Sequence, residues 1–323
     1  MAYWYALIFV LAVLLTLVLG KCILPLLIRL KIGQTIRSDG PQKHLSKAGT
    51  PTMGGFIFIV PMLILAAVFC KSRPELWLWL FSFLAFALIG CCDDTMKVVF
   101  HRSKGLSAVQ KLLGQFTAIA LLLAGAHIWA GRDTVLYLLP DLPVWDAGWL
   151  YYPLMAIFLV GLINAVNLTD GLDGLAAGVS LIVFCGYFIA FLILKGRGLD
   201  VGDQPVLACA FAGCCIGFLA YNHYPAKVFM GDTGSLALGG AIAGFALLGK
   251  TELLALGFGL IYLLEAASVM LQVGSYKLTG RRIFKMAPLH HHFEQMGWPE
   301  TKVSYMFWLA ALIIVLLSLI IAF

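Results

Sequence analysis

Three short acidic motifs stand at the ends of long apolar runs, where a membrane span meets water. One run ends at Cys92-Asp93-Asp94, another ends within Asn164 to Gly174, and the motif Phe229 to Ser235 precedes a third. Ionisable groups are costly to hold at such depths and usually mark a functional site. Their chemistry is that of binding a metal ion or a phosphate, or of moving a proton.

The motif at the end of the fifth apolar run carries oxygen ligands at helical spacing. Asn167, Asp170 and Asp173 are three residues apart and fall roughly along one helical face. Gly171 and Gly174 permit tight turns or close approach of the backbone. Hard cations take oxygen ligands, so this array predicts a Mg²⁺ site. The alternative is an Asp-Gly turn that only joins two helices.

Asp232 is a third potential metal contact, because it lies in a Gly-flanked turn and has little local use for its charge. The alternative is a purely structural role, in which Asp232 caps the following helix. Asp93 and Asp94 point about 100° apart on a helix, so we expect them to serve different purposes. One faces a metal or a phosphate, and the other handles a proton or Lys97. An Asp and Lys pair that anchors the helix end at the interface is the competing interpretation.

Two further segments suit phosphate groups. Thr50 to Gly55 follows Lys47 and precedes a span, and backbone amides at a helix start with nearby lysines attract phosphate. The residue order is not that of a P-loop, so ATP hydrolysis is not indicated. His290, His291 and His292 cannot all reach one ion from a regular helix, so zinc is not expected. Their imidazoles suit a diphosphate, with a basic loop on anionic lipid as the alternative.

The composition of the chain indicates that membrane-spanning helices position these motifs. Hydrophobic residues make up 62% of the 323 residues and charged residues only 12%, which leaves no soluble domain. A membrane-spanning helix needs roughly 20 apolar residues. We count ten such stretches, near 3–28, 53–71, 76–92, 108–130, 150–168, 174–194, 205–221, 233–249, 252–275 and 303–322. The expected fold is an all-α polytopic membrane protein with a single domain over residues 1–323.

The ninth stretch differs from the others, because it carries Glu265 and Gln272 with Ser268 between them. An uncovered glutamate in lipid is improbable on energetic grounds. We therefore expect this helix to be broken or to line a polar groove.

Positive charge predicts the orientation, since Lys and Arg accumulate in cytoplasmic loops. With both termini outside, the loops on one side hold fifteen of these residues and the opposite loops hold six. Every polar motif described above then lies on the cytoplasmic face.

Four motifs together carry a resemblance to a known family. They are Cys92 to Lys97, Asn164 to Gly174, Phe229 to Gly234 and Ala287 to Glu294. With them the chain resembles, along its whole length, the polyprenyl-phosphate N-acetylhexosamine-1-phosphate transferase superfamily. The Thr50 to Gly55 segment and the histidine-rich motif are similar to its phospho-N-acetylmuramoyl-pentapeptide transferase branch.

The resemblance implies ten spans, a cytoplasmic active site, a homodimer and Mg²⁺ dependence, in the cytoplasmic membrane of a bacterium. It implies UDP-N-acetylmuramoyl-pentapeptide as donor, undecaprenyl phosphate as acceptor, and lipid I and UMP as products. Membrane lipid is a further partner, and nucleic acid is not. Exchange of one diphosphate for another is near thermoneutral and needs no ATP. The barrier is electrostatic, and Mg²⁺ and lysines neutralise the two anions that meet.

The motifs and the resemblance predict roles for individual residues. Catalytic roles are expected for Asp93, Asp94, Lys111, Asp232 and His291. Asp232 is expected to bind Mg²⁺ directly, supported by Asn167 and Asp170. Contacts with the substrates are expected from Lys47, Thr52, Lys97, Asn167, Asp170, Gly171, Asp173, Asn222, Phe229, Gln272, His290 and His292.

Two other functions compete with this one. A sister transferase that uses UDP-N-acetylglucosamine shares the acidic motifs. A secondary transporter would hold its charges near the bilayer midplane and show paired halves. Here the charges cluster at one interface and the Asp-rich motifs do not repeat. The sequence leaves open whether transfer is direct or passes through an aspartyl-phosphate.

Overall fold

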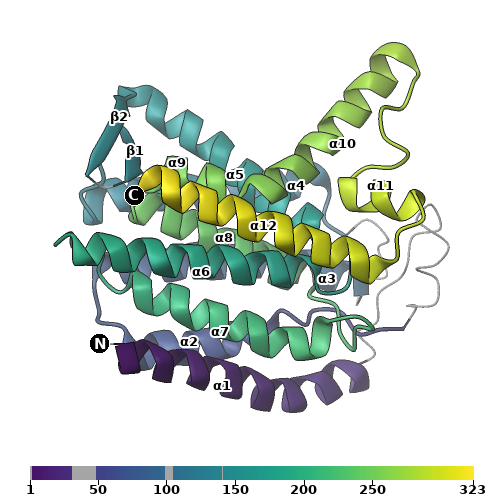
Figure 1. Ribbon diagram of the computed structural model, residues 1–323, viewed down its shortest axis with the longest axis horizontal. Helices are drawn as coiled ribbons and strands as arrows, with labels where there is room; N and C mark the ends of the chain where they lie inside the picture. The colour runs from purple at the N-terminus through teal and green to yellow at the C-terminus, as the bar shows by residue number, and fades with distance from the viewer. Residues whose placement is uncertain (1, 31–48, 99–104, 140) are drawn as a thin grey trace.

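The computed structural model describes residues 2–30, 49–98, 105–139 and 141–323 as helices packed side by side (Figure 1). Eight helices in this part of the chain are long and apolar enough to cross a membrane, so the predicted all-α polytopic fold is confirmed. Both termini lie at one end of the bundle, on the left of Figure 1. The eight helices are α1 (Ala2–Arg29), α3 (Pro74–Val98), α4 (Ala108–Trp129), α5 (Tyr151–Thr169), α6 (Leu175–Gly196), α7 (Gln204–Asn222), α8 (Gly231–Leu248) and α12 (Glu300–Ala322).

The second predicted span is shorter than expected. Its helix α2 covers Phe56–Phe69, which is 14 residues. The stretch was expected to begin near residue 53, but the backbone there pairs with the loop before α8. Gly54 N donates to Phe229 O and Gly55 N donates to Met230 O, both at 2.9 Å. The exact number of spans therefore stays a prediction.

The ninth predicted span is broken, as expected. Helices α9 (Glu252–Phe258) and α10 (Leu260–Thr279) meet at Gly259 and differ in direction by 74°. A Cβ atom on Gly259 would lie 2.8 Å from Leu162 Cδ1 of α5 and 2.9 Å from the backbone Ala255 O, so a side chain at this turn would force its surroundings to move. Helix α10 then leaves the bundle, and the chain returns through the short helix α11 (Leu289–Gln295) (Figure 1).

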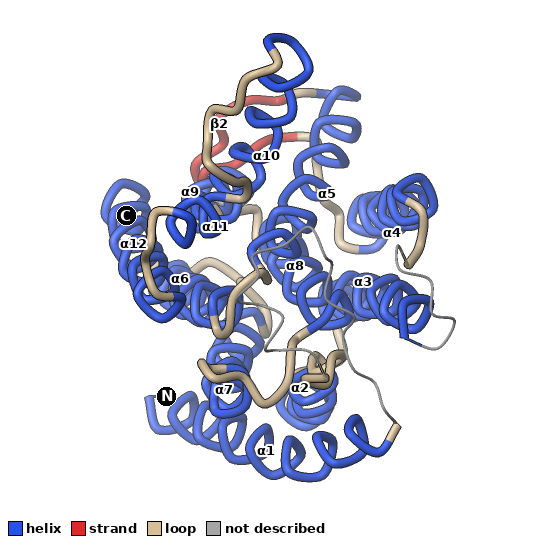
Figure 2. The backbone as a smooth tube through the Cα atoms, turned by 90° about the vertical axis from the view of Figure 1, so that its right-hand side faces the viewer, coloured by secondary structure: helices blue, strands red, loops and turns tan. Residues whose placement is uncertain are grey.

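Helix α8 lies at the centre of the bundle when the helices are viewed end-on (Figure 2). Small residues allow its neighbours to approach closely. A Cβ atom on Gly240 would lie 2.7 Å from Ser82 O, and one on Gly90 would lie 2.1 Å from Asp232 O. Because α3 and α8 touch backbone to backbone, the acidic end of α3 is placed beside the start of α8.

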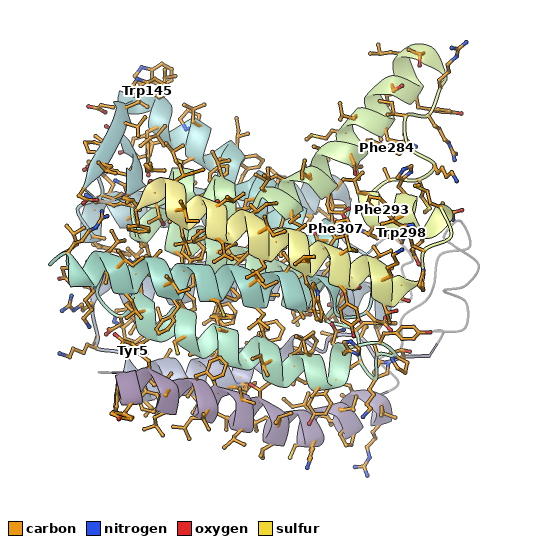
Figure 3. All side chains as sticks on the ribbon, in the orientation of Figure 1. Tyr5, Trp145, Phe284, Phe293, Trp298 and Phe307 are labelled. Atoms are coloured by element: carbon orange, nitrogen blue, oxygen red, sulfur yellow. The ribbon has the colours of Figure 1, made fainter. Side chains whose placement is uncertain are left out.

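One region departs from the all-helical plan. Strands β1 (Val135–Leu139) and β2 (Leu142–Asp146) form an antiparallel hairpin, followed by the 3-10 turn η2 (Gly148–Leu150). The hairpin carries Trp145 and lies at the end of the bundle that holds the termini (Figures 1 and 3). The hydropathy pattern had predicted only a connection between two spans here.

Candidate active site

Asp232, at the start of α8, accepts hydrogen bonds from side chains of three other helices. Its Oδ2 accepts hydrogen bonds from Lys97 Nζ and Lys111 Nζ, each at 2.9 Å. Its Oδ1 accepts from Asn167 Nδ2 at 2.8 Å. The expectation that Asp232 has little local use for its charge is therefore wrong, because residues of α3, α4 and α5 converge on it.

Asp93 and Asp94 have different partners, as expected for neighbours on a helix. Asp93 forms a salt bridge with Lys97 Nζ at 2.6 Å. Asp94 accepts from the backbone N–H groups of Asp232 (3.2 Å) and Thr233 (2.9 Å), and from Thr233 Oγ1 (2.7 Å). A carboxylate at this position satisfies free N–H groups and interacts favourably with the helix dipole. Helix α8 is thus capped by Asp94 from α3, not by Asp232.

The carboxylates of Asp93, Asp94 and Asp232 suit a hard cation. One oxygen atom of each lies within 4.8 Å of the others. Mg²⁺ binds oxygen at about 2.0–2.1 Å, so two ligands of one ion lie at most about 4.2 Å apart. Small side-chain shifts bring the three oxygens within that range. Of the further predicted ligands, Asn167 touches Asp232 directly, and Asp170 is not one of the three clustered carboxylates.

The negative charge of the acidic cluster acts on the carboxyl group of Asp170. Burial, followed by the negative charges of Asp232, Asp94 and Asp173, raises its pKa well above the usual range of an aspartate. A cation bound among these carboxylates would relieve the repulsion, which agrees with the oxygen-rich donor set.

Asp173 lies in the turn between α5 and α6 and not on a helical face. Helix α5 ends at Thr169, so the expected alignment of Asp173 with Asn167 along one helix is wrong. Asp173 Oδ2 accepts from Ala226 N at 2.8 Å, and Asp173 N donates to Glu300 Oε1 at 2.7 Å. The turn is thereby tied to the loop before α8 and to the start of α12.

Asn222 fastens the same turn to the loop before α8. Its Oδ1 accepts from Gly174 N at 3.2 Å, and its Nδ2 donates to Val228 O at 3.0 Å. The side chain is buried, and both the oxygen and the nitrogen of its carboxamide have hydrogen-bond partners. Phe229 follows in this loop, and its N–H donates to Pro51 O at 2.8 Å.

Thr52 lies beside the acidic cluster, because the backbone around it pairs with the loop before α8. It is buried, and a Cβ atom on Gly231 would lie 2.9 Å from Thr52 Oγ1 and 2.6 Å from Asp94 Oδ2. The amides of Gly54 and Gly55 donate to carbonyl groups of the loop before α8, and the expectation that this segment contacts a phosphate stays a prediction. Lys47, predicted to contact the substrate, lies outside the described residues.

The three consecutive histidines have three separate partners. His290 Nδ1 lies 3.1 Å from Glu265 Oε2 in α10. His291 Nδ1 lies 2.8 Å from Glu294 Oε2 within α11. His292 Nδ1 accepts from a backbone N–H of the preceding loop at 3.1 Å. The rings of His290 and His291 lie close together, with centroids 4.2 Å apart, but each of the three histidines has its own hydrogen-bond partner.

Gln272 holds the chain that returns from α10. Its Oε1 accepts from the N–H groups of Ile283 (3.0 Å) and Phe284 (2.9 Å), and its Nε2 donates to Phe284 O at 2.9 Å. This predicted substrate contact thus also has a structural use.

Sequence reasoning missed several residues of the site, among them Thr233, which binds Asp94, and also Ser235 and Glu300. Ser235 Oγ accepts from Asn167 Nδ2 at 2.8 Å and belongs to the third acidic motif, so its place in the motif was the available signal. Glu300 binds the backbone of Asp173 across 127 residues of sequence. No local pattern around Glu300 indicates this contact.

Comparison with known proteins identifies the family. The model of glycosyl transferase family 4 matches residues 76–250, and the phospho-N-acetylmuramoyl-pentapeptide-transferase signature 1 matches residues 47–59. A phospho-N-acetylmuramoyl-pentapeptide-transferase of Moorella thermoacetica is 50% identical over 315 residues, which cover 96% of each chain. The chain belongs to the phospho-N-acetylmuramoyl-pentapeptide-transferase family.

Other members of the phospho-N-acetylmuramoyl-pentapeptide-transferase family are equally similar. The relative from Heliobacterium modesticaldum is 51% identical over 318 residues, covering 97% of this chain and 96% of its own. The relative from Desulfitobacterium hafniense is 49% identical over 318 residues, with 96% and 95% covered. The region matched by the family 4 model contains all three acidic motifs, and the signature contains Thr52.

Proposed function

We propose that this protein transfers phospho-N-acetylmuramoyl-pentapeptide from its UDP donor to undecaprenyl phosphate, giving lipid I and UMP. The supporting observation is the convergence of Lys97, Lys111 and Asn167 on Asp232, beside two further carboxylates. These groups stand at the ends of membrane helices. Such a place suits a reaction between a water-soluble donor and an acceptor that stays in the bilayer.

The chemistry is an exchange at phosphorus. An oxygen of the lipid phosphate attacks the phosphorus that bears the sugar, and a new P–O bond forms. The bond from that phosphorus to the bridging oxygen breaks, and UMP leaves with this oxygen. The second pKa of a phosphate monoester is about 6, so the acceptor is largely dianionic at neutral pH. Asp93 then needs only to orient the acceptor or to take its last proton.

Direct attack is favoured over an aspartyl-phosphate. Asp94 is engaged by the first turn of α8, and Asp93 is paired with Lys97. A nucleophilic carboxylate would have to give up these partners first. Lys97 and Lys111 are instead suited to bind phosphoryl oxygens and to balance their charge.

Mg²⁺ is the cofactor in this proposal. Asp232 is its direct ligand, with Asn167 and Asp170 as further contacts and with Asp93 and Asp94 within reach. The bound ion neutralises charge on the diphosphate. The raised pKa of Asp170 and the clustered carboxylate oxygens support this choice.

The donor lies across the loops around Asp232. The uracil ring lies near Phe229 and Asn222 and the turn Asp170 to Asp173, since an aromatic face and polar edges read a base. The sugar and diphosphate are bound by Lys47, Thr52, Gln272 and the three histidines, which give the muramoyl specificity. Asn222 and Gln272 already bind backbone groups, so they contact substrate only by sharing those bonds.

The site faces the cytoplasm in this proposal, and the enzyme is a homodimer in the bacterial cytoplasmic membrane. The excess of Lys and Arg in the loops on the side of the acidic motifs supports the orientation. The dimer rests on the family resemblance.

Radiolabel transfer tests the function. Purified protein in detergent receives undecaprenyl phosphate, Mg²⁺ and either UDP-N-acetylmuramoyl-pentapeptide or UDP-N-acetylglucosamine, each labelled in the sugar. The expected result is labelled lipid and equimolar UMP from the muramoyl donor alone. Transfer from the other donor alone would assign the sister activity. Exchange of labelled UMP into the donor without lipid acceptor would contradict direct attack.

A further inference from the structure

Glu265 is a buried carboxylate that the proposed chemistry does not use. It lies in α10, just beyond the break in the ninth span, and its exposed fraction is 0%. A buried carboxylate without a partner is costly, above all at membrane depth. Its partner therefore indicates what Glu265 does, and that partner is His290 of α11.

The Glu265 carboxylate meets His290 at two points, the backbone N–H and the ring. Glu265 Oε1 accepts from His290 N at 3.2 Å, and Glu265 Oε2 lies 3.1 Å from His290 Nδ1. These two contacts fix the direction of the His290 ring, with Nδ1 turned to Glu265 and Nε2 left for other contacts. His290 is 1% exposed, and its Nε2 has no hydrogen-bond partner in the described part of the chain.

The Nε2 atom of His290 rests on the acidic turn between α5 and α6. A Cβ atom on Gly171 would lie only 2.2 Å from it, so the ring packs directly on the glycine backbone between Asp170 and Asp173. Glu265 thus holds the ring in the orientation that makes this contact.

Aromatic packing also holds α11 in place. Phe293 stacks on Trp298 with ring centroids 5.0 Å apart, and it lies edge-on to Phe307 at 6.0 Å (Figure 3). Apolar contacts of this kind are weakly directional. The bonds from Glu265 supply the direction that the rings lack.

We infer that Glu265 is a positioning residue for the transfer reaction. It fixes the orientation of His290 and thereby seats α11 against the turn that contains Asp170 and Asp173. The inference rests on the proposed function, in which this turn and the neighbouring histidines bind the donor. The bend at Gly259 sets the direction of α10, and with it the place of Glu265 beside α11.

Steady-state kinetics of Glu265→Gln tests this role. The variant keeps the size of the side chain but turns an acceptor toward Nδ1 into a group that also donates. We expect the KM for the UDP donor to rise on the order of 10- to 100-fold, as for other second-layer contacts, with the KM for undecaprenyl phosphate unchanged. An unchanged donor KM, or an equal rise in both KM values, would overturn the inference.

Glu252→Gln is the matched control. Glu252 is 1% exposed and lies in the other half of the bent helix pair, where it binds Arg132. The same substitution there is expected to lower Tm and to leave both KM values unchanged. A donor-specific rise in KM for Glu252→Gln as well would show that general loosening of the bent pair, and not positioning of His290, explains the effect.

A double-mutant cycle asks whether Glu265 acts through His290. In a His290→Ala background, Glu265→Gln is expected to have little further effect on the donor KM, and additive losses would contradict the inference. Gly171→Ala is expected to impair the wild type but to be tolerated with His290→Ala, because the ring that meets the new Cβ atom is gone. If wild-type protein transfers no sugar, the proposed function fails. The same cycle measured as Tm then still tests the contact, and absence of coupling there overturns it.

Discussion

Two clusters of buried charge lie at opposite ends of α8, and they are built on different plans. Asp232 stands in the first turn of the helix, whereas Leu247 O at its far end accepts from Arg132 Nε at 3.1 Å. The cluster around Asp232 has three carboxylates and two lysines. Its lysine side chains remain 33% exposed for Lys97 and 18% exposed for Lys111.

The cluster around Arg132 is closed and balanced. The side chains of Arg132 and Glu252 are 4% and 1% exposed and form a salt bridge. Tyr151 Oη also donates to Glu252, at 3.0 Å. The rings of Tyr137 and Tyr151 lie 4.9 Å and 5.5 Å from the guanidinium. Arg132 further binds Asp133, so each of its nitrogen atoms has a partner.

The difference separates a reactive cluster from a structural one. Around Arg132 every charge is matched and covered, so the cluster holds the hairpin, α8 and α9 together. Around Asp232 negative charge is in excess and the lysines are within reach of solvent. Unmatched charge in a membrane protein costs stability and is typical of a functional site. Substitutions in the two clusters should therefore separate activity from stability.

Asp232→Asn should have the largest effect on activity. We expect turnover to fall on the order of 10³-fold or more, because lysines, Asn167 and the proposed cation all meet on this carboxylate. Tm should fall less than in Arg132→Met, because relief of the repulsion among three crowded carboxylates offsets part of the lost bonds from Lys97 and Lys111. UMP release measures turnover, and thermal unfolding measures Tm. Asp141→Asn, which removes a carboxylate near Arg197 and far from this cluster, is the control. Retained turnover with unchanged Mg²⁺ dependence would remove Asp232 from its role.

Arg132→Met should show the opposite pattern. It leaves Glu252 buried without its cation, which is expected to lower the free energy of unfolding by about 3–5 kcal/mol. Turnover per folded molecule should stay near that of the wild type. Adding Glu252→Gln should recover part of the lost stability. A folded Arg132→Met protein with normal Tm and no activity would break the comparison.

Gly90→Ala should reduce activity without touching a charged group. The new Cβ atom would lie 2.1 Å from Asp232 O, so α8 must move away from α3. Such overpacking costs about 1–3 kcal/mol, and the shift displaces Asp232 from its partners. Gly161→Ala is the matched control, because no atom lies within 4 Å of its Cβ position. Equal activity of the two variants would argue against a geometric requirement at this contact.

Asp170→Asn should have the smallest effect on stability, a gain that depends on pH. The pKa of Asp170 is raised in the folded protein, so the folded state keeps its proton to higher pH than the unfolded chain. Stability therefore falls as pH rises above about 4, the unfolded pKa, and the loss is complete once the folded carboxyl ionises. In metal-free buffer the variant should exceed the wild type in Tm at neutral pH and match it near pH 3. A Tm difference independent of pH would contradict this cause.

Much of the protein follows from its sequence. Apolar runs of span length determine a membrane fold, since every backbone group in lipid must be satisfied within helices. Three acidic motifs at the ends of those runs indicate the site, and four motifs indicate the family. Glu265 in the ninth run predicts a broken helix, because a buried charge requires cover. Each of these inferences depends on residues close in sequence.

Only the tertiary structure decides how the motifs divide the work. Asp94 caps α8 by binding Thr233, which is 139 residues away in the sequence. Asp232 accepts a hydrogen bond from Lys97, which is 135 residues away. Neither contact has a local pattern, because it depends on how closely two distant helices approach. That distance is set at Gly90, where α3 meets the backbone of α8. In the same way, the pairing of residues 51–55 with the loop before α8 shortens α2, although hydropathy favours a longer helix. Hydrophobicity selects the elements, and backbone contacts between them select the geometry of the site.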